Sequence, residues 1–72
     1  MISQDALIGR RLLMVDSPSV RPKIVKVISS FYNVYRLHLE NGMEIIFSET
    51  SVSKLLAGLK VQGWVLMGFG EE

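Results

Sequence analysis

The segment from residue 34 to residue 47 constrains the fold more than any other part of the chain. Its sequence, VYRLHLENGMEIIF, alternates apolar and polar residues on both sides of the dipeptide Asn41-Gly42. A period of two is typical of a half-buried β-strand, and an Asn-Gly pair is typical of a hairpin turn. The segment therefore predicts two antiparallel strands joined by a tight turn.

The register of this hairpin follows from which side chains must share a face. A two-residue Asn-Gly loop would place apolar and charged side chains together on one face. A three-residue loop, residues 40–42, instead pairs Leu37 with Ile45 and collects the apolar residues on one side. This loop requires a left-handed backbone at its last residue, so we predict a positive φ angle at Gly42.

The remaining elements are shorter. Apolar runs rich in β-branched residues predict three further strands, at residues 12–15, 23–28 and 61–69. Apolar residues at helical spacing predict a two-turn helix at residues 52–59, with Ser51 as its N-cap. Two prolines and two serines between residues 16 and 22 predict a loop, because proline lacks the backbone donor that a central strand needs.

The order of these elements predicts the fold class. After a helical turn capped by Ser3 and ending at Gly9, five short strands follow, with one short helix before the last. This is the order of a small Src-homology-like or Tudor-like barrel, and it is close to the OB-fold, which needs another strand after the helix. We therefore expect residues 1–72 to form a single all-β domain, a small five-stranded Src-homology-like/Tudor-like (OB-related) barrel.

The composition excludes several kinds of site and environment. Without cysteine, the chain forms no disulfide, thiolate zinc site or iron–sulfur cluster. The longest uncharged stretch, residues 61–70, contains Gln62 and three glycines and is about half the length that spans a bilayer. The N-terminal segment has Asp5 before any apolar run and lacks the pattern of a signal peptide. We expect a cytoplasmic protein without a membrane partner.

Catalytic ingredients are few. The only histidine, His38, is predicted to lie on the polar face of the hairpin, opposite Glu44. The chain has no nucleophile elbow or phosphate-binding glycine loop, and its acidic residues form no local metal-ligand cluster. We therefore expect a binding protein that is not an enzyme and uses no cofactor or metal.

The charges are divided along the chain. Residues 1–39 carry six basic and two acidic residues, a net charge of +4, whereas residues 40–72 carry two basic and five acidic residues, a net charge of −3. Small barrels bind single-stranded nucleic acid by stacking bases on aromatic rings in a basic groove. The alternative is that the charges only solubilise the chain while the aromatic rings pack over one end of the barrel. The candidate nucleic-acid contacts are Arg10, Arg11, Arg21, Lys23, Lys26, Arg36, Phe31 and Tyr32.

One segment also resembles a known family. The stretch YRLHLENGMEI, residues 35–45, resembles the hairpin of bacterial translation initiation factor one and other OB-fold RNA binders. Outside this hairpin the chain differs from that family, because an extra strand and a proline-rich loop precede the hairpin and the family's final strand is missing. The resemblance implies nucleic acid as the ligand. With the basic-groove argument above, we expect the partner to be single-stranded RNA or DNA.

The last predicted strand has more apolar residues than one thin core can bury. We expect one of its faces to contact a second copy of the chain or another protein. The alternative is that the tryptophan covers the end of the barrel. The candidate interface residues are Trp64, Leu66, Met67 and Phe69. The sequence thus predicts a nucleic-acid-binding accessory or regulatory protein that forms homo-oligomers, or alternatively an adaptor or inhibitor acting through its last strand.

Overall fold

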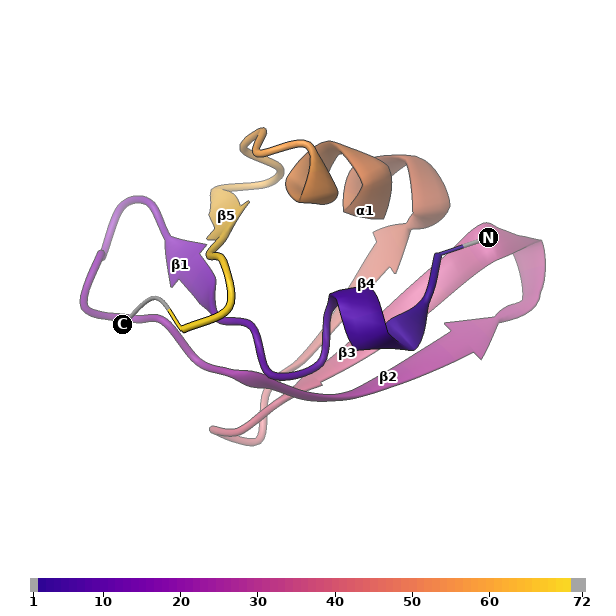
Figure 1. The fold of residues 1–72 in the computed structure, drawn as a ribbon, viewed down its shortest axis with the longest axis horizontal. Helices are drawn as coiled ribbons and strands as arrows, with labels where there is room; N and C mark the ends of the chain where they lie inside the picture. The colour runs from indigo at the N-terminus through magenta and orange to yellow at the C-terminus, as the bar shows by residue number, and fades with distance from the viewer. Residues whose placement is uncertain (1, 71–72) are drawn as a thin grey trace.

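The computed structural model describes residues 2–70, and Figure 1 shows how their elements are arranged. The helix α1 lies on the opposite side of the molecule from β2, with β1 and β5 at one end and the β2–β3 connection at the other. In chain order the elements are η1 (Gln4–Ala6), β1 (Leu12–Met14), β2 (Ile24–Ser30), η2 (Phe31–Asn33), β3 (Val34–Leu39), β4 (Glu44–Ser48), α1 (Glu49–Leu56) and β5 (Trp64–Leu66).

The strands form two open sheets, so the prediction of a closed five-stranded barrel is wrong. Strands β2, β3 and β4 pair in that order, and β1 pairs with β5 in a separate sheet. Within the described residues β5 pairs with β1 and not with β4, so β4 stays at the edge of the three-stranded sheet. Between β1 and β2 there is an isolated bridge of Arg11 with Lys23, next to which the N–H of Leu12 donates to the carbonyl of Pro22 at 3.0 Å. Pro22 has no N–H to return this bond, so the two strands do not form a continuous ladder.

The predicted register of the β3–β4 hairpin is confirmed. Leu37 pairs with Ile45 across the two strands. The N–H of Leu39 donates to the carbonyl of Met43 at 2.8 Å, which closes the hairpin around residues 40–42. Gly42 has a φ angle of 88°, in the left-handed region that this turn requires.

The helix starts three residues earlier than the sequence predicts. Its N-cap is Ser48, whose Oγ accepts a hydrogen bond from the N–H of Ser51 at 3.2 Å, so Ser51 lies inside the first turn. Gly58, with a φ angle of 89°, follows the end of the helix. Leu59, which was predicted to belong to the apolar helix face, is therefore 54% exposed.

The two ends of the chain agree with the sequence to different degrees. Ser3 caps the first turn as predicted, and Gly9 follows with a φ angle of 91°. The last strand is much shorter than the predicted range of residues 61–69. A tight turn precedes β5, with Gln62 at a φ angle of 53° and Gly63 at 83°, so residues 61–63 do not extend that strand. No helix within residues 2–70 is long and apolar enough to cross a membrane.

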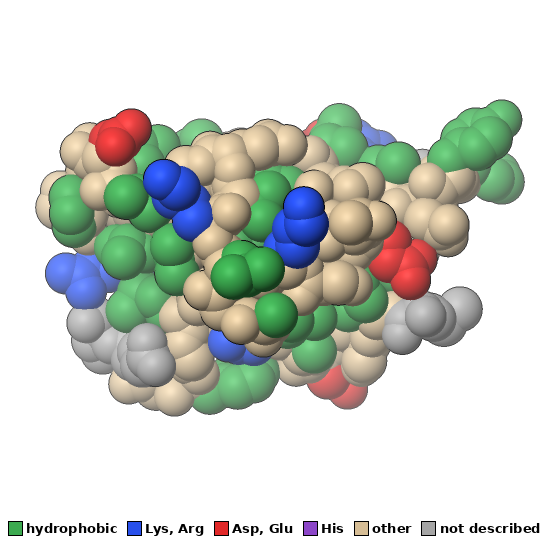
Figure 2. Space-filling model, turned by 90° about the horizontal axis from the view of Figure 1, so that it is seen from above, with side chains coloured by type: hydrophobic (Ala, Val, Ile, Leu, Met, Phe, Trp, Pro, Cys, Tyr) green, Lys and Arg blue, Asp and Glu red, His purple; other side chains and the backbone are tan. Residues whose placement is uncertain are grey.

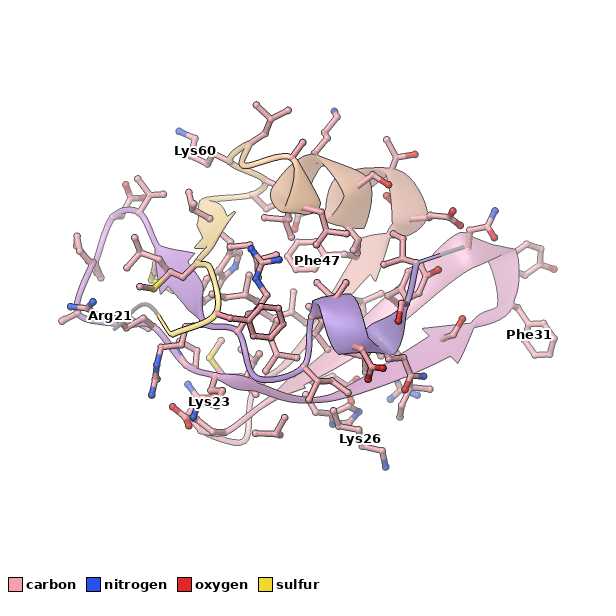
Figure 3. The ribbon with its side chains drawn as sticks, viewed as in Figure 1. Arg21, Lys23, Lys26, Phe31, Phe47 and Lys60 are labelled. Carbon is pink, nitrogen blue, oxygen red and sulfur yellow. The ribbon has the colours of Figure 1, made fainter. Side chains whose placement is uncertain are left out.

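The core lies between the three-stranded sheet, α1 and the β1–β5 pair. Phe47 of β4 lies near its centre, between the sheet and the helix (Figure 3). No polar or charged side chain of the described residues is buried with it. The buried side chains are Leu7, Leu12, Ile24, Val27, Tyr35, Leu37, Leu39, Phe47, Val52, Leu55, Trp64 and Leu66.

Candidate nucleic-acid interface

The side chain of Arg10 forms hydrogen bonds with two other segments of the chain. Its Nε donates to the carbonyl of Met67 at 2.7 Å, and its Nη1 donates to the carbonyl of Ala6 at 3.2 Å. The guanidinium also lies 5.4 Å from the centre of the Phe69 ring, within the range of a cation–π contact. Arg10 therefore holds the segment after β5 against the N-terminal turn.

Arg11 joins three segments of the chain. Its Nη1 donates to the carbonyl of Arg21 at 2.8 Å and to Oε1 of Glu40 at 2.9 Å. The pKa of Glu40 lies below its usual value, chiefly because its carboxylate accepts a hydrogen bond from the backbone of Lys23. Partial desolvation raises this pKa, but the hydrogen bond from Arg11 and the positive charges of Arg11 and Lys23 lower it further. We call Arg11 and Glu40 the inter-sheet clamp, because Arg11 precedes β1 and Glu40 belongs to the β3–β4 turn.

Arg36 is also paired. On the outer face of the three-stranded sheet, its Nε and Nη2 donate to the carboxylate of Glu44 at 3.0–3.2 Å. His38 lies beside them, with its Nε2 3.2 Å from Oε2 of Glu44. The predicted His38–Glu44 pair is thus present, and the charge of Arg36 is largely balanced by its neighbour.

Three of the predicted cations remain for a ligand. Arg21, Lys23 and Lys26 follow one margin of the molecule, along the start of β2 (Figure 3). Neither Arg21 nor Lys26 forms an ion pair with another of residues 2–70, although Lys23 contributes to the field at Glu40. These three residues form what we call the basic margin.

The predicted aromatic contacts lie at the other end of β2. Phe31 is 84% exposed and Tyr32 is 95% exposed, at the tip of the β2–β3 hairpin. Hydrophobic side chains project from this end of the molecule in Figure 2, and Figure 3 places Phe31 far from Arg21. The structure therefore does not gather aromatic rings and cations into one compact groove. It spreads them along β2, in a molecule whose longest dimension is 32 Å.

The backbone of this tip is strained. Tyr32 and Asn33 have φ angles of 63° and 56°, which are uncommon for residues other than glycine. Asparagine tolerates this conformation, but a tyrosine there costs on the order of 1 kcal/mol. Since its ring is also almost fully exposed, neither packing nor backbone preference explains a tyrosine at position 32.

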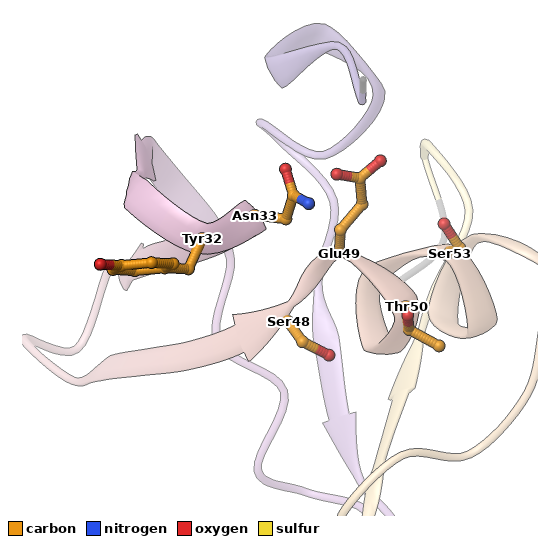
Figure 4. Close-up of a pocket in the computed structure, with 6 residues that line it drawn as sticks. All are labelled: Tyr32, Asn33, Ser48, Glu49, Thr50 and Ser53. Atoms are coloured by element: carbon orange, nitrogen blue, oxygen red, sulfur yellow. The ribbon is translucent and has the colours of Figure 1, made fainter.

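A hollow of about 460 Å³ lies beside the tip (Figure 4). It is formed where η2 meets the first turn of α1, and it joins one aromatic ring to an amide, a carboxylate and three hydroxyl groups. The lining residues are Tyr32, Asn33, Ser48, Glu49, Thr50 and Ser53. Sequence reasoning missed this hollow because the helix was placed too late, so the polar run SETSVS at residues 48–53 was not connected with the hairpin tip.

The predicted partner interface is only partly at the surface. Trp64 and Leu66 are 7% and 6% exposed and belong to the core. Met67 is half-buried, whereas Phe69 is 63% exposed and lies beside Arg10. The strand that was expected to contact a partner therefore exposes little beyond its end.

Comparisons with protein-family models, with curated proteins and with solved structures give no match. In the part of the chain that the structure describes, no group of three or more His, Asp or Glu side chains could hold a metal ion. The surface features that could contact a ligand are the basic margin, the exposed tip and the hollow.

Proposed function

We propose that this protein binds single-stranded nucleic acid along β2 and acts as an accessory or regulatory protein rather than as an enzyme. The observation that carries the proposal is the exposure of Phe31 and Tyr32 at the hairpin tip. Leaving a large apolar side chain in water forgoes about 1.5–3 kcal/mol of burial free energy. Stacking of a base on an aromatic ring contributes about 1–3 kcal/mol, which would account for aromatic residues at such a position.

The basic margin supplies the second part of the binding surface. Arg21, Lys23 and Lys26 precede the tip along the chain, so phosphates of an extended strand could lie beside them while its bases reach the rings. The seven residues of β2 span roughly 20 Å at about 3.3 Å per residue. This length suits a ligand of a few unpaired nucleotides.

The charge arrangement also sets the expected salt dependence. Because Arg10, Arg11 and Arg36 are used within the fold, about three cations contribute to phosphate binding. Each neutralised phosphate of a single strand contributes about −0.7 to the slope of log K against log salt. The proposal thus predicts a slope of about −2, shallower than six free cations would give.

Fluorescence anisotropy tests the proposal directly. Labelled single-stranded RNA, single-stranded DNA and duplex DNA are titrated at about 50 and 200 mM salt. We expect single strands to bind, with affinity falling by roughly tenfold or more at the higher salt, and duplex DNA to bind less tightly because its bases are already stacked. An absence of single-strand binding at the lower salt would refute the proposal.

The alternative function is a protein adaptor or inhibitor that acts through the last strand. It has less surface than the sequence predicted, because Trp64 and Leu66 are buried and only Phe69 of that set is more than half exposed. A pull-down in which Phe69→Ala abolishes capture of a protein, with nucleic-acid binding absent, would favour this alternative.

A further inference from the structure

We infer that the hollow beside Tyr32 receives the ribose of a bound nucleotide, so that this protein binds single-stranded RNA in preference to single-stranded DNA. The inference rests on the proposed function, because it requires a base to stack on the exposed tip. It starts from the chemistry of the hollow, whose lining combines one aromatic ring with five polar side chains from η2, the end of β4 and α1.

The lining excludes several kinds of ligand group. None of the six lining residues is basic, so the lining offers a phosphate no positively charged partner. Apart from Tyr32, none of them is apolar, so a hydrophobic group would gain little. The group that fits is neutral and polar, and it can both donate and accept hydrogen bonds.

Not every lining side chain is equally available. The hydroxyl of Ser48 already accepts from the N–H of Ser51 and donates to the Ser51 Oγ, at 3.2 and 3.1 Å. Asn33, Thr50 and Ser53 are exposed and make no side-chain hydrogen bond with another of residues 2–70. These two hydroxyls and one amide therefore keep donors and acceptors that hydrogen bonds within the described residues do not use.

The ribose 2′-hydroxyl matches this requirement. It is a neutral group that donates and accepts, and it distinguishes RNA from DNA at a binding site. The sugar is bonded directly to its base, so a base stacked on Tyr32 brings the sugar to the adjoining hollow.

The test compares three oligonucleotides of one sequence: RNA, DNA and 2′-O-methyl RNA. We expect the wild-type protein to bind RNA about tenfold more tightly than DNA, as one or two additional hydrogen bonds would give. The 2′-O-methyl RNA should bind like DNA, because it has lost the hydroxyl donor. The double variant Thr50→Val/Ser53→Ala should lower RNA affinity to the DNA level and leave DNA affinity unchanged.

The matched control is Ser19→Ala, which removes an exposed hydroxyl from the loop between β1 and β2 and should leave the RNA-to-DNA ratio unchanged. Equal binding of RNA and DNA by the wild type would overturn the ribose site while leaving the proposed function intact. A double variant that keeps its RNA preference, or loses RNA and DNA binding equally with an unchanged melting temperature, would also overturn it. Failure to bind either single strand would refute both proposals.

Discussion

Tyr32 combines two features that a folded chain usually avoids at one position. Its backbone is in the left-handed region, where glycine or asparagine is favoured, and its ring is 95% exposed. Folding gains little from either feature. A residue of this kind is better explained by a ligand than by the fold, and the explanation can be tested by separating stability from binding.

Replacing Tyr32 with glycine should separate the effect of this residue on stability from its effect on binding. Relief of backbone strain offsets the entropy that glycine loses on folding, so we expect the free energy of unfolding to stay within about 1 kcal/mol of the wild type. Affinity for single-stranded nucleic acid should fall about tenfold. Urea denaturation and anisotropy measure the two effects, and Leu59→Ala, at another exposed apolar position, should leave binding unchanged. A loss of stability above about 2 kcal/mol would assign the ring to the fold instead.

Unlike Tyr32, Gly42 is explained by the fold, because the β3–β4 turn needs a left-handed backbone at this position. A Cβ atom at this position would meet no atom within 4 Å, so the cost of Gly42→Ala comes from its φ angle of 88° alone. We expect a loss of about 1 kcal/mol in the free energy of unfolding, and a smaller loss for Gly42→Asn. An unchanged urea midpoint for the alanine variant would contradict this account of the turn.

At the scale of elements, β2 carries both parts of the proposed binding surface. The basic margin lies at its start and the aromatic tip at its end, so the strand fixes their separation. The sheet also keeps Lys26 on the outer face, where it pairs in register with His38. The spacing between the phosphate and base contacts is thus a property of the strand.

Removing one cation from this strand should change the salt dependence in a defined way. We expect Lys26→Ala to make the slope of log K against log salt shallower by about 0.7 for a single-stranded ligand. The matched control is Lys60→Ala, on the side of the molecule where α1 lies (Figure 3), which should leave the slope unchanged. Equal effects of the two variants would mean that β2 is not the phosphate-binding element.

The elements also differ in how much the sequence could predict. The β3–β4 register was predictable, because the turn chemistry and the alternation lie within one short segment and agree. The helix start was not, since Ser48 and Ser51 are both good caps, and the pairing of Ser48 with Val34 at the end of β4 decides between them. The hollow could not be predicted either, because four of its lining residues belong to the end of β4 and the start of the helix.

Long-range contacts account for the remaining differences. Arg10 looks like a free cation in the sequence, but its partner is the carbonyl of Met67, 57 residues away. Closure of a barrel likewise depends on whether β4 and β5 form hydrogen bonds with each other. No short stretch of the sequence determines this pairing. Trp64 could be assigned to a partner or to the core with equal local support, and the packing of β5 against α1 and β1 decides for the core.

At the scale of the whole molecule, the two small sheets are joined outside the core by backbone hydrogen bonds between the segments on either side of the β1–β2 loop and by side-chain contacts. One is the inter-sheet clamp, in which Arg11 bonds Glu40 across the gap between β1 and the β3–β4 turn. The carboxylate must be ionised for this pair to form. Its lowered pKa shows that the folded state favours the ionised form more than the unfolded chain does.

The clamp predicts an acid dependence of stability. Because the pKa of Glu40 is lowered in the folded state, its contribution is present above its ordinary value of 4.5 and is lost as the pH falls through the folded value. We expect the free energy of unfolding to decrease below about pH 4.5 and the Glu40→Gln variant to show a flatter acid limb. Urea midpoints measured across this range test it, and parallel curves for the two proteins would exclude Glu40 as a source of the dependence.

The open three-stranded sheet has a consequence for solubility. In this register the N–H and C=O of Ile46 point away from β3, and β4 has no further strand beside it within the described residues. Glu44–Ser48 contains no lysine or proline, the residues that commonly protect an exposed edge, and the Ile46 residue is 57% exposed. The unpaired edge of β4 can therefore pair with another molecule, and we expect this association to limit the concentration at which the protein stays monomeric. Ile46→Lys should raise that limit, which light scattering across a dilution series would show.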